Sequence, residues 1–212
     1  MKILEIDSLS KKFDGQTIFS NFSLSLKVGE KLLIKGKSGC GKSTLLKMIL
    51  GFETHSSGTI SVNSMVLSPE TVWEIRKKAA YVPQEPELPP TTVQNYIHEC
   101  FNYNANKQNA EDADKANELL EIFDLKHEIL NADTKSISGG EKQRIVLTAA
   151  LLMKRPIILL DEASSALDPK SKEKVISYLG SQENLTLLAV SHESEWEKMC
   201  GRTIELTEVD AK

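Results

Sequence analysis

One stretch of eight residues constrains the fold of this chain more than any other. Residues 36–43, Gly-Lys-Ser-Gly-Cys-Gly-Lys-Ser, fit the pattern G-x-x-x-x-G-K-[ST]. The apolar run 31–36 predicts a short strand before it, and the apolar spacing of 43–50 predicts a helix after it. In that setting the glycines let backbone N–H groups face an anion, and the helix N-terminus adds positive charge. We therefore expect a phosphate-binding loop made of Gly36, Lys37, Ser38, Gly39, Cys40, Gly41, Lys42, Ser43 and Thr44.

Three side chains of this loop have separate expected roles. Lys42 would reach the β- and γ-phosphates of a nucleotide, and the Ser43 hydroxyl would bind Mg²⁺. Cys40 is interpreted as a small residue that fills space in the loop. The alternative is a glycine-rich turn with a lysine placed there by chance. The predicted strand and helix on either side argue against it.

Two adjacent carboxylates come after a second apolar strand. Residues 157–160 are Ile-Ile-Leu-Leu, and Asp161 and Glu162 come next. A buried strand would carry Asp161 to the edge of the sheet, where a carboxylate can hold Mg²⁺ through water. Glu162 would then lie beside the γ-phosphate, where it can orient or deprotonate an attacking water. This pair favours a hydrolase over a small-molecule kinase, which needs a pocket for the phosphate acceptor.

Short apolar strands alternate with amphipathic helices along much of the chain. That alternation predicts a single α/β domain, residues 1–212, with a mainly parallel sheet. Residues 85–156 are predicted to be helical and inserted between core strands, with Thr92 capping one helix. The core is expected in residues 1–84 and 157–212.

Composition excludes several other classes of protein. The net charge of −4 and the pI of about 5.7 argue against a basic nucleic-acid-binding surface. Three widely spaced cysteines make a poor disulfide framework and suit a reducing compartment. The longest apolar runs are too short to cross a bilayer, so any work at a membrane would need a partner.

Residues 138–141, Ser-Gly-Gly-Glu, have two interpretations. Taken alone, Ser-x-x-Glu before an apolar helix is a capping box, and that interpretation is favoured. The stretch does not stand alone, because other motifs surround it in a fixed order. The chain resembles the nucleotide-binding subunit of ABC transporters over almost its whole length. The motifs that carry the resemblance are the phosphate loop, Gln84 at a strand end, SGGEKQR (138–144), IILLDE (157–162), SALD (165–168) and Ser191-His192.

The resemblance implies an ABC-type P-loop NTPase fold with an antiparallel β subdomain, and it assigns residues around the bound nucleotide. Phe13 matches the aromatic residue that stacks on adenine, where tyrosine is commoner. Gln84 matches the glutamine that contacts Mg²⁺ and the attacking water and relays to the membrane partner. His192 matches the histidine that touches the γ-phosphate. The implied catalytic residues are Glu162, His192 and Gln84, and the implied Mg²⁺ ligands are Ser43, Gln84 and Asp161.

The resemblance also implies contacts made across a dimer. Ser138, Gly139 and Gly140 match the signature that binds the γ-phosphate of ATP held by the other subunit. Asp168 matches a loop that crosses the dimer interface. Glu141 departs from the family pattern, in which glutamine is usual. A carboxylate there suits the helix N-terminus but competes with a phosphate for the same amides.

The resemblance implies an ATPase that powers a transporter through a separate membrane-spanning subunit. The implied assembly is a head-to-tail, ATP-dependent homodimer or heterodimer at the cytoplasmic face of the cell membrane, without nucleic acid. Residues 84–101 are the expected contact with the membrane subunit. An ATPase that drives a non-transport membrane complex, such as one for signalling, force transmission or lipoprotein release, is an alternative. A DNA-maintenance ABC ATPase fits less well, because residues 51–137 lack the sustained heptads of a coiled-coil insertion.

The cargo is predicted from two stretches, together with the compact ending of the given sequence. SGGEKQRI (138–145) and LLDEASSALD (159–168) look closest to subunits of bacterial iron or metal export, although lipoprotein-release and peptide-export subunits are similar in size. The sequence shows no metal-binding cluster, so a transported metal would be recognised by another chain.

Overall fold

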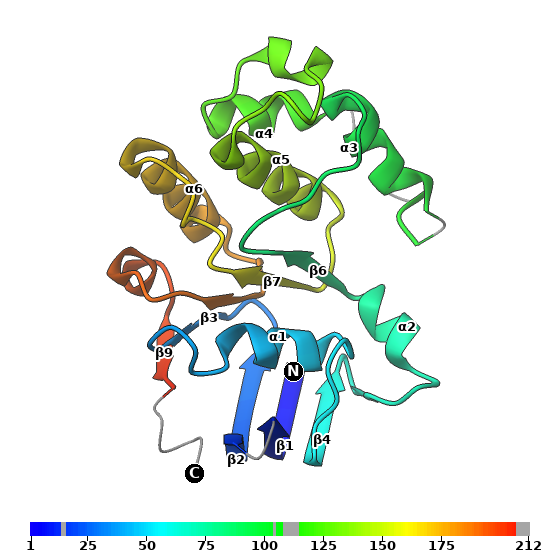
Figure 1. Cartoon of the computed structure of the whole chain (residues 1–212), viewed down its shortest axis with the longest axis vertical. Coiled ribbons are helices and arrows are strands. Elements are labelled where there is room, and N and C mark those ends of the chain that lie inside the picture. The colour runs from blue at the N-terminus through cyan, green and yellow to red at the C-terminus, as the bar shows by residue number, and fades with distance from the viewer. Residues whose placement is uncertain (14–15, 104, 108–114, 207–212) are drawn as a thin grey trace.

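Two β-sheets organise the chain in a computed structural model, which describes residues 1–13, 16–103, 105–107 and 115–206 (Figure 1). One sheet is antiparallel, with strand order β2-β1-β4-β5. The other is parallel, with order β6-β7-β8-β3-β9. The antiparallel strands are β1 (Lys2–Phe13), β2 (Gln16–Lys27), β4 (Ser57–Val62) and β5 (Met65–Val66), and the parallel strands are β3 (Lys31–Lys35), β6 (Ala79–Val82), β7 (Ile157–Asp161), β8 (Leu187–Val190) and β9 (Arg202–Glu205).

The helices lie in layers around these sheets. In Figure 1, α1 lies between the two sheets, and α5 and α6 cover the other side of the parallel sheet. Helices α3 and α4 pack on α5. The α-helices are α1 (Lys42–Ile49), α2 (Val72–Arg76), α3 (Val93–Asn102), α4 (Ala116–Ile122), α5 (Gly139–Leu152) and α6 (Pro169–Ser181), and the 3₁₀-helices are η2 (His127–Asn131) and η3 (Ser194–Lys198).

Strand β7 is buried along its whole length and separates two parts of the core. Side chains alternate between the faces of a strand. Ile157 and Leu159 therefore join the core that contains α1 and the antiparallel sheet, whereas Ile158 and Leu160 join the core beneath α5 and α6. A strand covered on both faces needs a continuous apolar sequence, which residues 157–160 provide.

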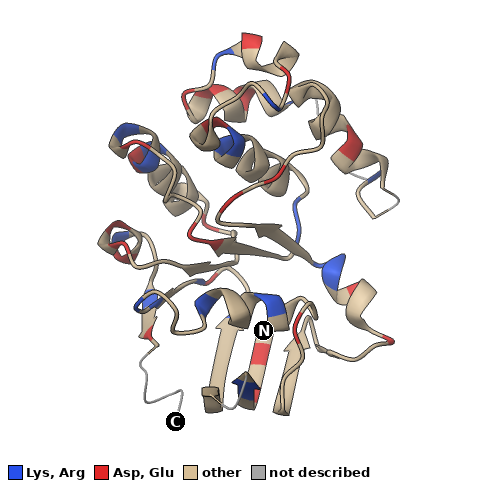
Figure 2. Ribbon diagram, in the orientation of Figure 1, with Lys and Arg blue, Asp and Glu red and all other residues tan. Residues whose placement is uncertain are grey.

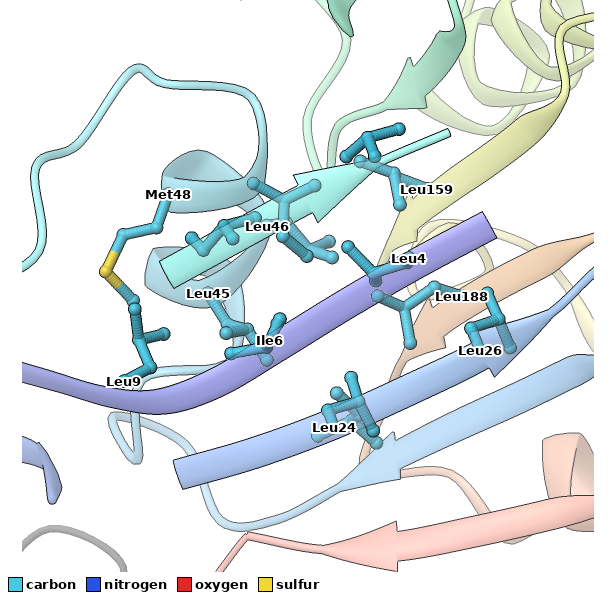
Figure 3. Packing of buried hydrophobic residues seen from close by; sticks show 14 of the residues in the cluster. Leu4, Ile6, Leu9, Leu24, Leu26, Leu45, Leu46, Met48, Leu159 and Leu188 are labelled. Carbon is cyan, nitrogen blue, oxygen red and sulfur yellow. The ribbon is translucent and has the colours of Figure 1, made fainter. Parts of the chain in front are cut away.

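The apolar face of α1 holds the preceding loop in place. Figure 3 shows Leu45 and Leu46 of α1 packed among side chains of β1, such as Ile6, with Leu159 and Leu188 of the parallel sheet nearby. Leu45 and Leu46 are fully buried. Burying each of these side chains contributes about 1.5–3 kcal/mol. The start of α1 is thus anchored to both sheets.

A third apolar cluster joins α3, α4, η2 and α5. It includes Val93 and Ile97 of α3, Leu120 of α4 and Ile145 of α5. Thr92 caps α3 as predicted, because its side chain accepts a hydrogen bond from the Asn95 N–H. The mainly parallel α/β fold with inserted helices is confirmed, whereas the division at residues 85 and 156 stays a prediction. In the described residues no helix is both long and apolar enough to cross a bilayer.

Two details differ from the sequence-based expectation. Strand β6 ends at Val82, so Gln84 lies in the loop beyond the strand rather than at its last position. Helix α2 was not predicted, because its five residues are too few to show a helical period.

Figure 2 shows residues of both charge signs on α2, α5 and α6, as a small net charge leads one to expect.

Candidate active site

The glycine-rich loop lies between β3 and α1, as predicted. Gly41 is the N-cap of α1 and has a φ of 96°, in the left-handed region that favours glycine. A Cβ atom at Gly41 would lie 2.6 Å from Cγ2 of Ile18, so the position has neither the backbone conformation nor the space for another residue. Lys42 ties the loop together, because its Nζ donates to the carbonyls of Gly36 and Lys37, both at 2.9 Å.

Lys42 also faces the end of β7. Its side chain is 5% exposed, and its Nζ lies 3.6 Å from Oε1 of Glu162. The other carboxylate oxygen of Glu162 lies 3.5 Å from Nδ1 of His192, whose ring is exposed. The Glu162 carboxylate therefore lies between the Lys42 ammonium and the His192 imidazole, at the centre of this cluster.

A second set of contacts joins α1 to β6 and β7. The Ser43 hydroxyl donates to Oδ1 of Asp161 at 2.7 Å, and the Tyr81 hydroxyl donates to Oδ2 at 3.0 Å. Burial, with the negative charge of Asp161, raises the pKa of Tyr81, so its hydroxyl keeps the proton that it donates. Asp161 is held from both sides, next to Glu162.

The backbone at Glu162 adopts an uncommon conformation. Its φ is 45°, in the left-handed region, and its N–H donates to the carbonyl of Val190 at 2.9 Å. Such a conformation in a residue other than glycine costs about 1–3 kcal/mol and persists where the surroundings fix it. The turn directs the Glu162 side chain toward Lys42 and His192.

Phe13 and Gln84 lie outside this hydrogen-bonded cluster, as far as the described residues show. Phe13 ends β1 and is 57% exposed, and Gln84 is exposed in the loop after β6. Both side chains are available to a ligand or to another chain.

The start of α5 shows the capping box that the sequence predicted. The Ser138 hydroxyl and N–H both donate to Oε2 of Glu141, at 2.8 and 2.7 Å, and the Glu141 N–H donates back to the hydroxyl at 3.3 Å. Gly140 packs closely on the segment that leads into α6, where a Cβ would lie 2.9 Å from the Ala166 carbonyl oxygen. Helix α5 covers the face of the parallel sheet opposite α1, so one chain does not bring Ser138 to Lys42.

Asp168 caps α6 from the end of the same segment. Its Oδ1 accepts hydrogen bonds from the N–H groups of Lys170 and Ser171, both at 3.1 Å. The contacts with Ser171 hold the pKa of Asp168 below its usual value, which keeps the capping carboxylate ionised. Residues 138–140 and Asp168 thus lie together, apart from the loop.

Comparison with known proteins decides the family. The sequence model of the family described as "ABC transporter" matches residues 19–165, more than half of the chain. The chain belongs to the ABC transporter ATP-binding family. It is accordingly an ATP-binding ATPase subunit of the ABC transporter type, and the resemblance drawn from the motifs is confirmed.

Individual ABC relatives match nearly the whole chain. The energy-coupling factor transporter ATP-binding protein EcfA1 of Oenococcus oeni is 32% identical over 216 residues, covering 98% of this chain and 77% of the relative. The probable ABC transporter ATP-binding protein PEB1C of Campylobacter jejuni is 35% identical, covering 92% of this chain and 83% of the relative. The solved dimer of the ATP-binding cassette MJ0796 with ADP and Pi is 26% identical with a TM-score of 0.83, covering 97% of this chain and 94% of that chain.

Sequence reasoning missed two residues of this ABC ATPase that support the site. Tyr81 lies three residues before Gln84, which the sequence analysis placed at a strand end, but only the pairing of β6 with β7 shows that the Tyr81 hydroxyl reaches Asp161. Gln143 is fully buried, and its amide donates to the Pro83 carbonyl at 3.1 Å, which ties α5 to the loop that carries Gln84. A polar residue on the buried face of α5 was the available signal for Gln143.

Proposed function

We propose that this chain binds MgATP at the loop 36–44, hydrolyses it with Glu162, and passes the resulting motion to a separate membrane-spanning subunit. The observation that carries the proposal is the meeting of Lys42, Glu162 and His192 beside Asp161. An ammonium suits a phosphate, and a carboxylate that faces it can take a proton from water.

The residues present fit a magnesium ion. Ser43 Oγ and Asp161 Oδ1 lie 2.7 Å apart, and Gln84 adds an exposed amide, so the available donors are the oxygens that this hard cation prefers. We assign Ser43, Asp161 and Gln84 as the residues that would hold it, directly or through water. Bound there, the ion would neutralise charge on the β- and γ-phosphates.

Each remaining residue of the site has one task in this proposal. Lys42 binds the phosphates, and Phe13 stacks on the adenine ring. Glu162 accepts a proton from the water that attacks the γ-phosphate, and His192 orients the phosphate by a hydrogen bond. The N–H groups of the loop bind the remaining phosphate oxygens.

The separation of Ser138 from Lys42 supports a site completed by a second chain. In a head-to-tail dimer, Ser138, Gly139 and Gly140 of one subunit would reach the ATP held by the other, with Asp168 at the interface. The dimer named for MJ0796 supports this arrangement, as a homodimer or with a similar subunit. Residues 85–156 would then move as a helical subdomain against the core of residues 1–84 and 157–212 when ATP is bound.

Residues 84–101 are our proposed contact with the membrane subunit, at the cytoplasmic face of the cell membrane. The test is an affinity column of the Glu162→Gln chain with MgATP, over which detergent-solubilised membranes are passed, with an ATP-free column as control. We expect one polytopic membrane protein to be retained only with ATP, and the reconstituted pair to transport. Retention of soluble proteins alone would contradict the proposal, and a pair that hydrolyses ATP without transport would indicate a non-transport membrane complex.

Iron or metal export is the finer proposal for the cargo, supported by the sequences 138–145 and 159–168. Deleting the gene should raise cellular iron content and lower tolerance to added metal. Elemental analysis and growth curves measure both, and restoring the gene is the control. Unchanged metal content and tolerance would contradict this cargo while leaving the ATPase assignment intact.

Glu141→Gln should strengthen ATP-dependent dimerisation. In the structure the Glu141 carboxylate accepts hydrogen bonds from the N–H and the hydroxyl of Ser138. The γ-phosphate of the partner's ATP would need the same two donors. Glutamine keeps the capping box but removes the negative charge at the helix N-terminus. We expect the ATP concentration at half-maximal dimerisation to fall about threefold to fivefold, a change of ~1 kcal/mol for such a charge. Glu128→Gln, an exposed position on η2, is the control, and an unchanged or weaker dimer would show that the carboxylate does not compete.

A further inference from the structure

A buried polar network joins the segment that carries His192 to the segment between Glu162 and Asp168. The indole N–H of Trp196 donates to the Ser164 hydroxyl oxygen at 2.8 Å, and Ser164 donates its own proton to Glu193. Trp196 and Ser164 are almost completely buried, at 1% and 0% exposure. Removing one partner of such a contact leaves a buried polar group unpaired, so the network is costly to break.

The carboxylate of Glu193 also reaches α6. Lys172 of α6 donates to its other oxygen, and the side chains of the two residues are only 16% and 15% exposed. Burial alone would raise the pKa of Glu193, but the hydrogen bonds from Lys172 and Ser164, together with the positive charges of Lys172 and His192, outweigh burial and hold the pKa below its usual value. One ionised carboxylate therefore joins three separate parts of the chain.

The backbone is held by hydrogen bonds at the residues directly before and after His192. The Ser191 N–H donates to the Ile34 carbonyl at 3.1 Å, and the Glu193 N–H donates to the Ser191 hydroxyl, also at 3.1 Å. The His192 side chain itself is 60% exposed. Because the His192 ring is exposed, its position depends on how Ser191 and Glu193 are held. Glu193 is hydrogen-bonded to Ser164, which lies in the segment that ends at Asp168.

We propose that Glu193 is a positioning residue that couples His192 to residues 164–168. A shift of Asp168 when two subunits meet would move Ser164, and the contact between Ser164 and Glu193 would carry that shift to His192. Hydrolysis would then depend on a correctly formed dimer interface. This inference rests on the proposed roles of His192 and Asp168.

The test is Glu193→Gln, which keeps the shape and an acceptor for Ser164 but removes the ion pair with Lys172. A displacement of a catalytic group by about 1 Å can lower the rate about a hundredfold. We expect kcat to fall about tenfold to a hundredfold and the cooperativity of hydrolysis with ATP concentration to fall, with the Kd for ATP within about twofold. Glu195→Gln, an exposed position on η3, is the matched control and should behave as the wild type.

Lys172→Gln removes the same ion pair from α6 and serves as a second variant if Glu193→Gln folds poorly. The two changes together should lower kcat no more than the worse single change, because they break one contact. Wild-type kcat in both variants, or equal losses of ATP affinity and kcat, would overturn the coupling. His192→Ala tests the proposed role of His192 separately from the coupling through Glu193. If it hydrolyses ATP at the wild-type rate, the proposed role of His192 fails; if it is slow while the Glu193 and Lys172 variants are fast, only the coupling fails.

Discussion

Glu162→Gln should leave a chain that binds ATP and scarcely hydrolyses it. The glutamine amide has the shape of the carboxylate but cannot accept a proton from water. Removing a general base lowers the rate about 10²- to 10⁴-fold. Since Lys42 and the loop stay in place, the loss should appear in kcat rather than in ATP affinity.

The same variant should accumulate as an ATP-bound dimer. Glu162 places a negative charge 3.6 Å from Lys42, the residue that we propose binds the γ-phosphate. A neutral side chain removes that repulsion and also prevents the hydrolysis that would release the subunits. Size-exclusion chromatography with MgATP should show the dimer, and phosphate release should be near background. Glu173→Gln, an exposed position on α6, is the control. Turnover at the wild-type rate would rule out Glu162 as the base.

Local sequence was enough to predict the parts of the site that are built from one strand and the residues directly after it. The loop 36–43 begins directly after β3, and Asp161 and Glu162 lie at the end of β7, as the apolar runs before them led us to expect. The capping box at Ser138 was predictable for the same reason, because its contacts span three residues. In these cases the chemistry and the geometry lie within one short segment.

The contacts that sequence did not predict depend on the order of the strands. Tyr81 reaches Asp161 only because β6 lies next to β7, although 80 residues separate the two in sequence. Glu193 reaches Ser164 because the chain after β8 returns to the segment after β7. No local pattern reports which strands will be neighbours. Residues that support a site from a distance are therefore found only when the fold is known.

Lys42→Ala should weaken MgATP binding more than any other single change in the loop. The wild-type ammonium is almost fully buried and already lies beside two carbonyls and Glu162, so little ordering remains when phosphate arrives. Losing one charge-assisted hydrogen bond costs about 1.5–3 kcal/mol, which predicts a Kd about 10- to 100-fold higher.

Calorimetry with MgATP measures that affinity directly. Lys47→Ala is the matched control, since Lys47 lies on the same helix with its side chain exposed and should bind as the wild type does. Because Lys42 also ties the loop together, the thermal midpoint of both variants should be compared with that of the wild type. A small change in midpoint with a large loss of affinity would assign the effect to phosphate binding. Unchanged affinity in the Lys42→Ala chain would contradict the phosphate-binding loop itself. Lys42 and Lys37 are the two positively charged side chains of residues 36–44, and Lys42 is the one that faces Glu162.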